Sequence, residues 1–355
     1  MRGRAEGATE PSTPTGSTFL SDNASGVHPE VLAALARANR GHARAYGADR
    51  FTRAAVETVR RHFGEDAEVF FVFGGTAANV LALRPIVDSI DAVLCAESSH
   101  VWRDECGAPE HFLGAKLIPV ETAQGKLTVA ALRPHLHLLG DVHHSQPRVV
   151  SLTQPTEWGT VYTLDELRTL CDFAHQHGLL VHLDGARLAN AAVFLDCPLR
   201  ATSRDVGVDV LSLGGTKNGL MGAEAIIFFD PALARRAEFH RKQAMQLASK
   251  MRFLAVQFDT LLGGDLWRES ARHANVMAAR LAELLGAIGG VEIVRPVESN
   301  VVFLLLPRAA LSLAERWPFL VWAPEGPIVR LMTTFDTSED DLVAFTEALA
   351  TAVGA

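Results

Sequence analysis

Cysteine and lysine are both scarce in this chain of 355 residues. The four cysteines are widely spaced and form no Cys-x-x-Cys pair, so the sequence indicates neither a disulfide framework nor a zinc site. We therefore expect reduced thiols, a cytoplasmic location and no bound metal. Only five lysines stand against 28 arginines, which makes the setting of each lysine informative.

A net positive charge and long apolar runs are also missing. The formal net charge is -8, whereas a protein that binds nucleic acid normally presents a basic face. No apolar run reaches the roughly 20 residues that a membrane span needs. The first 17 residues are polar and lack the apolar core of a signal peptide. We expect a globular protein that binds neither nucleic acid nor membrane.

Short apolar runs alternate with helical patterns through the first two thirds of the chain. These runs are mostly apolar on both faces, which is typical of strands in a sheet covered on both sides. Their alternation with helices predicts a mostly parallel, doubly wound sheet. The seven predicted strands are Val69–Phe73, Ala92–Cys95, Lys116–Val120, Val149–Thr153, Leu179–Leu183, Val208–Leu213 and Ala225–Phe229.

The clearest predicted helix is Leu164–His177, where Thr163 and Glu166 fit a capping box. From Pro231 onward the pattern changes to one long helical stretch, residues 231–262, and then to mixed elements. The later predictions are helices near Leu266–Leu285 and Ser338–Ala352, and strands Val291–Arg295, Asn300–Leu306 and Ile328–Met332.

Three parts are therefore predicted along the chain. Residues 1–18 form a disordered arm, residues 19–260 a large α/β domain, and residues 261–355 a smaller α+β domain. The composition changes that support these limits are the polar N-terminus and the loss of strand–helix alternation near residue 260.

One lysine follows a predicted strand directly. Lys217 lies in Ser-Leu-Gly-Gly-Thr-Lys-Asn-Gly (212–219), where glycines allow the backbone to approach a ligand closely. A lysine amine forms a Schiff base with an aldehyde, which an arginine cannot do. A loop lysine in solvent is the alternative.

A carboxylate and a guanidinium follow another predicted strand, in His-Leu-Asp-Gly-Ala-Arg (182–187). Ligands of open α/β sheets bind at the carboxyl ends of the strands. There Asp184 suits a protonated pyridine nitrogen, and Arg187 suits a carboxylate. The alternative is an internal ion pair between Asp184 and Arg187.

Two further motifs also follow predicted strands. Phe-Gly-Gly-Thr-Ala-Ala-Asn (73–79) opens a helix, and free N–H groups at a helix N-terminus bind phosphate. A tight turn capped by Thr76 explains the same residues. In Ser-Ser-His-Val-Trp-Arg-Asp-Glu (98–105), His100 suits stacking on a planar ring, and Glu105 is either a site carboxylate or a solvated one.

The four motifs follow strands of one predicted sheet, so their loops should meet at one edge. Together they supply a phosphate cradle, a ring-stacking side chain, a partner for a pyridine nitrogen and an amine for a Schiff base. Pyridoxal 5'-phosphate (PLP) needs this set. A nucleotide site of Rossmann type is a weaker interpretation, because the Gly-x-Gly-x-x-Gly fingerprint is absent and Lys217 has no role in it.

The chain closely resembles the low-specificity L-threonine aldolases, which belong to the fold type I PLP enzymes. The resemblance runs from about Phe19 to the C-terminus. The motifs that carry it, besides the three around Gly74, Asp184 and Lys217, are Leu-Ser-Asp-Asn (20–23), Ala-Tyr-Gly-Ala-Asp (45–49), Lys-Met-Arg (250–252) and Val-Arg-Leu-Met (329–332).

This resemblance implies an aspartate-aminotransferase-like fold and a role for individual residues. The implied catalytic residues are Lys217, His100 and Asp184. The implied cofactor-binding residues are Gly74, Gly75, Thr76, His100, Asp184, Arg187, Lys217 and Arg252, the last often reaching a neighbouring subunit. The implied substrate-binding residues are Ser21, Tyr46, Glu105, Arg187 and Arg330. Arg330 also needs a partner because it interrupts an apolar strand, unless that strand lies at an edge.

The implied activity is retro-aldol cleavage of L-threonine, L-allo-threonine or related β-hydroxy-α-amino acids to glycine and an aldehyde. Serine hydroxymethyl transfer, β-elimination and transamination remain alternatives with the same lysine and aspartate. A homodimer or homotetramer with shared sites is expected. One stretch departs from the family: Glu157 in Thr-Gln-Pro-Thr-Glu-Trp-Gly (153–159) stands where many members have a histidine. The base that takes the hydroxyl proton is therefore open between His100, a water molecule and Glu157.

Overall fold

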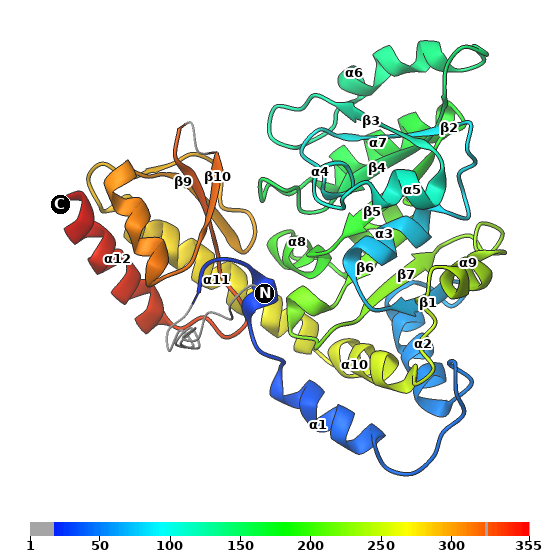
Figure 1. The fold of residues 1–355 in the computed structure, drawn as a ribbon, viewed down its shortest axis with the longest axis horizontal. Helices are drawn as coiled ribbons and strands as arrows, with labels where there is room; N and C mark the ends of the chain where they lie inside the picture. The colour runs from blue at the N-terminus through cyan, green and yellow to red at the C-terminus, as the bar shows by residue number, and fades with distance from the viewer. Residues whose placement is uncertain (1–17, 324–325, 355) are drawn as a thin grey trace, which may run out of the picture.

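Two sheets organise the chain in the computed structural model, which describes residues 18–323 and 326–354 (Figure 1). The larger sheet has seven strands in the order β1-β7-β6-β5-β4-β2-β3. Neighbouring pairs from β6 to β3 are parallel, and only β7 runs against its neighbours. The predicted mostly parallel, seven-stranded sheet is confirmed. Its strands are β1 (Glu68–Val72), β2 (Asp91–Ala96), β3 (Lys116–Val120), β4 (Gln146–Thr153), β5 (Leu180–Gly185), β6 (Val210–Gly214) and β7 (Glu224–Phe228).

Helices pack against the large sheet, as its apolar strands require. Central strands are buried on both faces: every residue of β7 is buried, as are the last five of β5. Helix α7 has the predicted capping box, in which Thr163 and Glu166 bind each other's backbone N–H. The helices of this part are α1 (Pro29–Ala38), α2 (Arg50–Phe63), α3 (Gly75–Leu83), α4 (His100–Arg103), α5 (Ala108–Leu113), α6 (Val129–Leu132), α7 (Leu164–Gln176) and α8 (Leu188–Phe194).

The single long helix predicted over residues 231–262 is wrong. The structure has two helices there, α9 (Ala237–Gln243) and α10 (Arg252–Leu262). Met245 lies between them with a left-handed φ of 64°, a conformation that no helix continues through. The side-chain oxygen of Gln246 accepts a hydrogen bond from the backbone N–H of Phe73 at 3.0 Å, so the break reaches the end of the first strand.

The second sheet is antiparallel and has four strands in the order β10-β11-β9-β8. It packs with α11 and α12 beside the larger part, and α11 crosses between the two (Figure 1). Strand β10 was not predicted, although the apolar run after Pro318 is a strand signal. The elements are α11 (Leu266–Gly286), β8 (Glu292–Ile293), β9 (Val301–Leu305), β10 (Leu320–Ala323), β11 (Ile328–Met332) and α12 (Glu339–Val353).

The start of the described chain lies on this second sheet. Phe19 is fully buried, its backbone N–H binds the carbonyl of Pro318, and its ring lies 4.9 Å from that of Phe345. The predicted disordered arm lies outside the described residues except for Thr18. The domain limits at residues 18 and 260 stay a prediction. Among the described residues, no helix is both long and apolar enough to cross a membrane.

The glycines before Lys217 are needed for packing, and Gly214 also lines the cavity described below, so close approach to a ligand stays a prediction. A Cβ at Gly214 would collide with the backbone of Ala186, and a Cβ at Gly215 with the carbonyl of Ala223. The end of β6 therefore lies tightly against the turn that follows β5, which fixes the position of the next residues.

Replacing Gly214 with alanine tests this packing. We expect Gly214→Ala to lower the free energy of unfolding by roughly 1–3 kcal/mol, the usual cost of overpacking. The measurement is the midpoint of thermal unfolding. Gly26→Ala is the matched control, because a Cβ there meets nothing within 4 Å. Equal midpoints for the two variants would contradict the close packing.

Candidate active site

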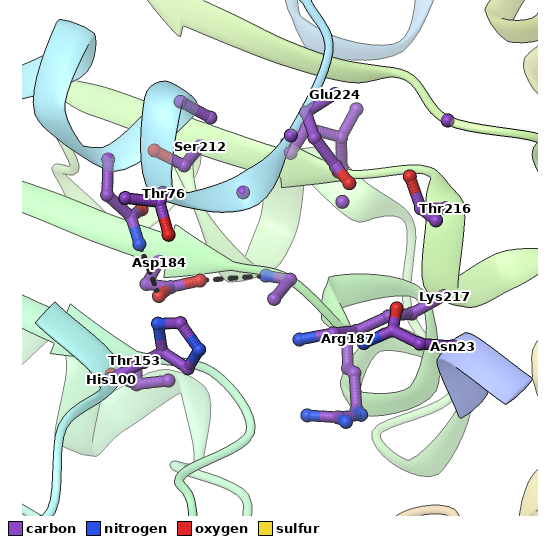
Figure 2. Close-up of a pocket in the computed structure, with 18 of the residues that line it drawn as sticks. Asn23, Thr76, His100, Thr153, Asp184, Arg187, Ser212, Thr216, Lys217 and Glu224 are labelled. Atoms are coloured by element: carbon purple, nitrogen blue, oxygen red, sulfur yellow. Dashed lines mark hydrogen bonds between the residues drawn. The ribbon is translucent and has the colours of Figure 1, made fainter. Parts of the chain in front are cut away.

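Three parallel strands end side by side at the carboxyl edge of the large sheet. Thr153 of β4 pairs in register with Asp184 of β5, and Asp184 pairs with Ser212 of β6. All three line a cavity of about 290 Å³. The cavity also receives His100 from α4 and Lys217 from the turn after β6 (Figure 2). The sheet thus brings the predicted motifs to one edge, as expected.

Asp184 is buried and is held by neutral donors. Its Oδ1 accepts a hydrogen bond from the backbone N–H of Ala186 at 3.0 Å, and its Oδ2 accepts one from Nδ2 of Asn79 at 2.8 Å (Figure 2). The alternative ion pair between Asp184 and Arg187 is not formed. The carboxylate faces the cavity and has no ion-pair partner among the described residues.

Arg187 forms an ion pair with Asp22 instead, which lies 165 positions earlier in the sequence. Its Nε and Nη2 donate to the two carboxylate oxygens at 2.5 and 2.8 Å. Burial tends to raise the pKa of Asp22, but the Arg187 guanidinium outweighs it and lowers that pKa below its usual value. Asn300 also donates to Asp22 at 3.2 Å. Arg187 is therefore held rigidly where it lines the cavity.

His100 begins α4 and lies beside Asp184 in the cavity (Figure 2). Its Nδ1 is 2.8 Å from Oε1 of Glu105, whose side chain is fully buried. The hydrogen bond to Glu105 raises the pKa of His100, against the effect of burial. Glu105 was expected to line the pocket, but it lies behind the imidazole and holds it. Because the Glu105 carboxylate is buried and bound to Nδ1, it fixes the orientation of the His100 imidazole.

Lys217 lies on a single turn of 3-10 helix, Thr216–Asn218, and its amine points into the cavity toward Asp184 and His100 (Figure 2). Within the described part of the chain, no hydrogen bond or ion pair holds this amine. The alternative of a loop lysine in solvent is wrong. Nearby Glu224 is buried, and burial raises its pKa to about 7. Its Oε2 accepts a hydrogen bond from the N–H of Gly215 at 2.8 Å.

The N-terminus of α3 forms part of the cavity wall. Gly74 is the N-cap residue, and no side chain caps the helix, so the predicted alternative of a Thr76 cap is wrong. A Cβ at Gly74, Gly75 or Gly222 would meet nothing within 4 Å, so these glycines leave open space in the cavity. Free N–H groups around open space at a helix N-terminus fit a phosphate.

A second cavity, of about 670 Å³, continues from the first past shared residues that include Lys217 and Arg187. Ser21 and Arg330 line it. Arg330 lies on β11, between β10 and β9, so it is central in its sheet and the edge-strand alternative is wrong. Its Nε is buried without a hydrogen-bond partner among the described residues. Burial, followed by repulsion from Arg187, lowers the pKa of Arg330 to about 10.

Glu157 lies where the two cavities meet. Its Oε1 accepts a hydrogen bond from the backbone N–H of His100 at 3.2 Å. Burial and then the nearby Asp184 raise its pKa, while His100, Lys217 and Arg187 act against that rise. The residue that departs from the family pattern is thus part of the site and has an unusual protonation equilibrium.

Besides Glu105, two more predicted site residues lie outside both cavities. Tyr46 is half exposed and has the ammonium of Lys242 over its ring at 5.1 Å. Arg252 donates to the carbonyl of Gly41 at 3.1 Å and lies over the ring of Phe253. Their roles in binding cofactor or substrate are not supported by contacts within this chain.

Sequence reasoning missed three residues that the structure places at the site. Asn79 binds Asp184, Asp22 holds Arg187, and Glu224 lines the cavity near Lys217. Asn79 and Asp22 occur inside motifs already singled out, so their polar character was a usable signal. No sequence motif around Glu224 indicates a functional role. Its position beside the buried N–H of Gly215 is known only from the three-dimensional structure.

Comparison with known proteins agrees with this geometry. The sequence profile of the β-eliminating lyase family matches residues 18–308. The low specificity L-threonine aldolase of Pseudomonas aeruginosa is 49% identical over 322 residues, which cover 90% of this chain and 93% of that protein.

Solved structures of related proteins also resemble this chain in fold. A threonine aldolase of Leishmania major has a TM-score of 0.90 and 32% identity, covering 95% of this chain and 99% of that one. An Escherichia coli protein with a methionine aminotransferase function has a TM-score of 0.70 at 15% identity, covering 95% and 93%, and is similar in fold alone. The aspartate-aminotransferase-like fold is confirmed.

Replacing Glu105 tests the pair behind the cavity. Because the Glu105 carboxylate raises the pKa of His100, Glu105→Gln should return that pKa toward its ordinary value near 6.5. Because the pKa of His100 is raised in the folded state, the pair of His100 and Glu105 stabilises the folded protein fully below about pH 6.5. This stabilisation is lost as the pH rises through the folded-state pKa of His100. NMR titration of the cofactor-free protein measures the change, with His100→Gln to assign the signal.

Asp104→Asn serves as the control for this titration, because Asp104 is exposed and its carboxylate is not among the groups that shift the pKa of His100. It should leave the titration of His100 unchanged. An unchanged pKa in Glu105→Gln would refute the assigned role of the carboxylate.

Proposed function

Because the chain belongs to the β-eliminating lyase family, we propose that it is a PLP-dependent aldolase that cleaves threonine, allo-threonine or related β-hydroxy-α-amino acids to glycine and an aldehyde. One observation carries the proposal: Lys217, Asp184 and the open N-terminus of α3 line a single cavity. The 49% identity to a low specificity L-threonine aldolase supports the choice of reaction.

The residues present fit the cofactor in their chemistry. Lys217 supplies an amine for its aldehyde, Asp184 a buried carboxylate for its ring nitrogen, and the glycines at positions 74, 75 and 222 a cradle for its phosphate. His100 supplies a flat face beside the ring. When bound, PLP supplies an electron sink for the bond that breaks at the α-carbon of the amino acid.

Two arginines bind the substrate carboxylate in this proposal. Arg187 is already neutralised by Asp22, so Arg330, with its buried and unpartnered Nε, provides the uncompensated positive charge. A carboxylate held by both guanidinium groups satisfies that donor and fixes the direction of the β-substituent. Ser21 lies at the same cavity and closes this end of the site.

Glu157 takes the proton of the β-hydroxyl group. Among the residues that the structure describes, only Oε1 of Glu157 accepts a hydrogen bond, from the backbone N–H of His100. Oε2 can therefore accept a proton at the junction of the cavities. Loss of that proton as the Cα–Cβ bond breaks releases the aldehyde, and the return of a proton to the α-carbon yields glycine. A carboxyl group with a raised pKa holds a proton well enough to act in both directions.

The sites are shared between subunits of a homodimer or homotetramer. Support comes from Tyr46 and Arg252, which lie near each other on the surface, away from this chain's cavities: the N–H of Tyr46 binds the carbonyl of Ser249. A partner's cavity would give both residues the roles that their motifs imply. A cytoplasmic location agrees with four unpaired cysteines, of which Cys95 and Cys171 are buried.

β-Elimination is the second candidate, because the family profile that matches is that of β-eliminating lyases. Product analysis separates the two reactions. Aldol cleavage of threonine releases acetaldehyde and glycine, whereas β-elimination releases ammonia and a keto acid. The proposal requires the aldehyde as the main product; a keto acid as the main product would replace aldol cleavage with β-elimination at the same site.

Removing the amine at position 217 tests the cofactor site. Lys217→Ala should abolish the visible absorbance of the purified protein, its change on addition of glycine, and nearly all aldehyde release. Lys217→Arg keeps the positive charge and should fail equally, because a guanidinium cannot bond to the aldehyde. Lys116→Ala, at an exposed position, should match the wild type. A Lys217→Ala protein with normal turnover would refute the proposal.

Removing the carboxyl group at position 157 tests the base. Glu157→Gln should lower kcat for threonine by about 10²–10⁴-fold and leave the visible absorbance in place. Since burial raises the pKa of Glu157, the wild-type kcat should fall on the acid side at a pH above the usual glutamate range, and this limb should vanish in the variant. An unchanged kcat and pH profile would assign the proton transfer to another group.

A further inference from the structure

One side-chain amide joins the two buried carboxylates of the site. Nδ2 of Asn79 donates to Oδ2 of Asp184 and to Oε1 of Glu105, both at 2.8 Å. The same Oε1 lies 2.8 Å from Nδ1 of His100. Asp184 and Glu105 are each 4% exposed and Asn79 is 2% exposed. A continuous chain of hydrogen bonds therefore connects the carboxylate beneath the cavity with the imidazole beside it.

The arrangement uses a property that few side chains have. Two buried carboxylates repel each other, and here they lie no further apart than twice a hydrogen-bond length. The NH₂ group of asparagine offers two donors from one neutral atom, so it binds both without adding charge. The orientation of the amide follows, because the opposite orientation would turn its oxygen toward two carboxylates.

The oxygen of the Asn79 amide is not part of this chain of hydrogen bonds. Oδ1 of Asn79 is buried and has no hydrogen-bond partner among the described residues. Leaving an acceptor buried without a partner costs free energy, so the position is not optimised for helix packing alone. The asparagine sits on α3, the helix whose N-terminus forms the phosphate cradle, and it reaches the end of β5.

We propose that Asn79 is a positioning residue for the cofactor ring: it fixes the Asp184 carboxylate toward the ring nitrogen and, through Glu105, fixes the face of His100. This rests on the proposed pairing of Asp184 with that nitrogen. Asn79 does not touch the reacting atoms. Its contribution is to make the ring partner and the stacking side chain one rigid unit, so that a single helix sets both together with the phosphate cradle.

Cofactor binding to the cofactor-free protein provides the test. Two probes are titrated by absorbance or fluorescence: PLP, and the carbocyclic analogue in which carbon replaces the ring nitrogen. Asp184 recognises only the former through its nitrogen. In Asn79→Leu we expect the Kd of PLP to rise at least 10-fold and that of the analogue less than 3-fold. Loss of affinity for both probes by the same factor would reduce Asn79 to a structural residue and overturn the proposal.

Further variants separate the possible failures. Asp184→Asn should also abolish the preference for PLP over the analogue. If it keeps that preference, the pairing of Asp184 with the ring nitrogen is wrong, and the proposal falls with it. If Asp184→Asn loses the preference and Asn79→Leu keeps it, the role of Asn79 alone is refuted and the proposed function stands.

Two more substitutions distinguish a specific effect of Asn79→Leu from poor folding of that variant. Asn79→Ser keeps one donor and should give a loss of PLP preference between that of the wild type and that of Asn79→Leu. Leu83→Val changes packing on the same helix, at a fully buried position away from the network, and should leave the ratio of the two Kd values unchanged. A ratio altered as much by Leu83→Val as by Asn79→Leu would overturn the specific role.

Discussion

The site depends on a buried carboxylate at the end of the fifth strand that has no ion-pair partner among the described residues. Burying a charge is costly unless a partner is present, and Asp184 has only two neutral donors. In the proposed function, a protonated ring nitrogen in the cavity would supply the missing positive partner. Under that proposed pairing, the register that places Asp184 between Thr153 and Ser212 would decide where the cofactor lies and which side of the cavity Lys217 faces.

Charge is divided around the cavity in a consistent way. Arg187 and Asp22 neutralise each other, which leaves Arg330 as the cation with an unsatisfied buried donor. Glu157 lies where the cavity of about 290 Å³ meets the cavity of about 670 Å³. In the proposed function, positive charge would attract the carboxylate of an amino acid, and the hydroxyl end would lie near Glu157, whose pKa is raised by burial. This distribution of charge suits cleavage of the Cα–Cβ bond, which lies between the carboxylate and the hydroxyl group of the amino acid.

Much of the fold and site was predictable because strand periodicity and local motifs are properties of neighbouring residues. The seven strands, the capping box at Thr163 and the convergence of Lys217, Asp184, His100 and Gly74 followed from them. The partners of these residues did not. Arg187 pairs with Asp22 across 165 positions of sequence, and no local pattern reveals such a contact. The break near Met245 was missed for a related reason, since the hydrogen bond that joins the adjacent Gln246 to the distant Phe73 is not visible in any local pattern.

Nuclear magnetic resonance of the bound cofactor tests the central claim most directly. With PLP labelled with ¹⁵N in its ring, the chemical shift reports whether the nitrogen carries a proton. The pairing with Asp184 predicts a protonated nitrogen in the wild type at neutral pH and an unprotonated one in Asp184→Asn. An unprotonated nitrogen in the wild type, or the same shift in both proteins, would contradict the account.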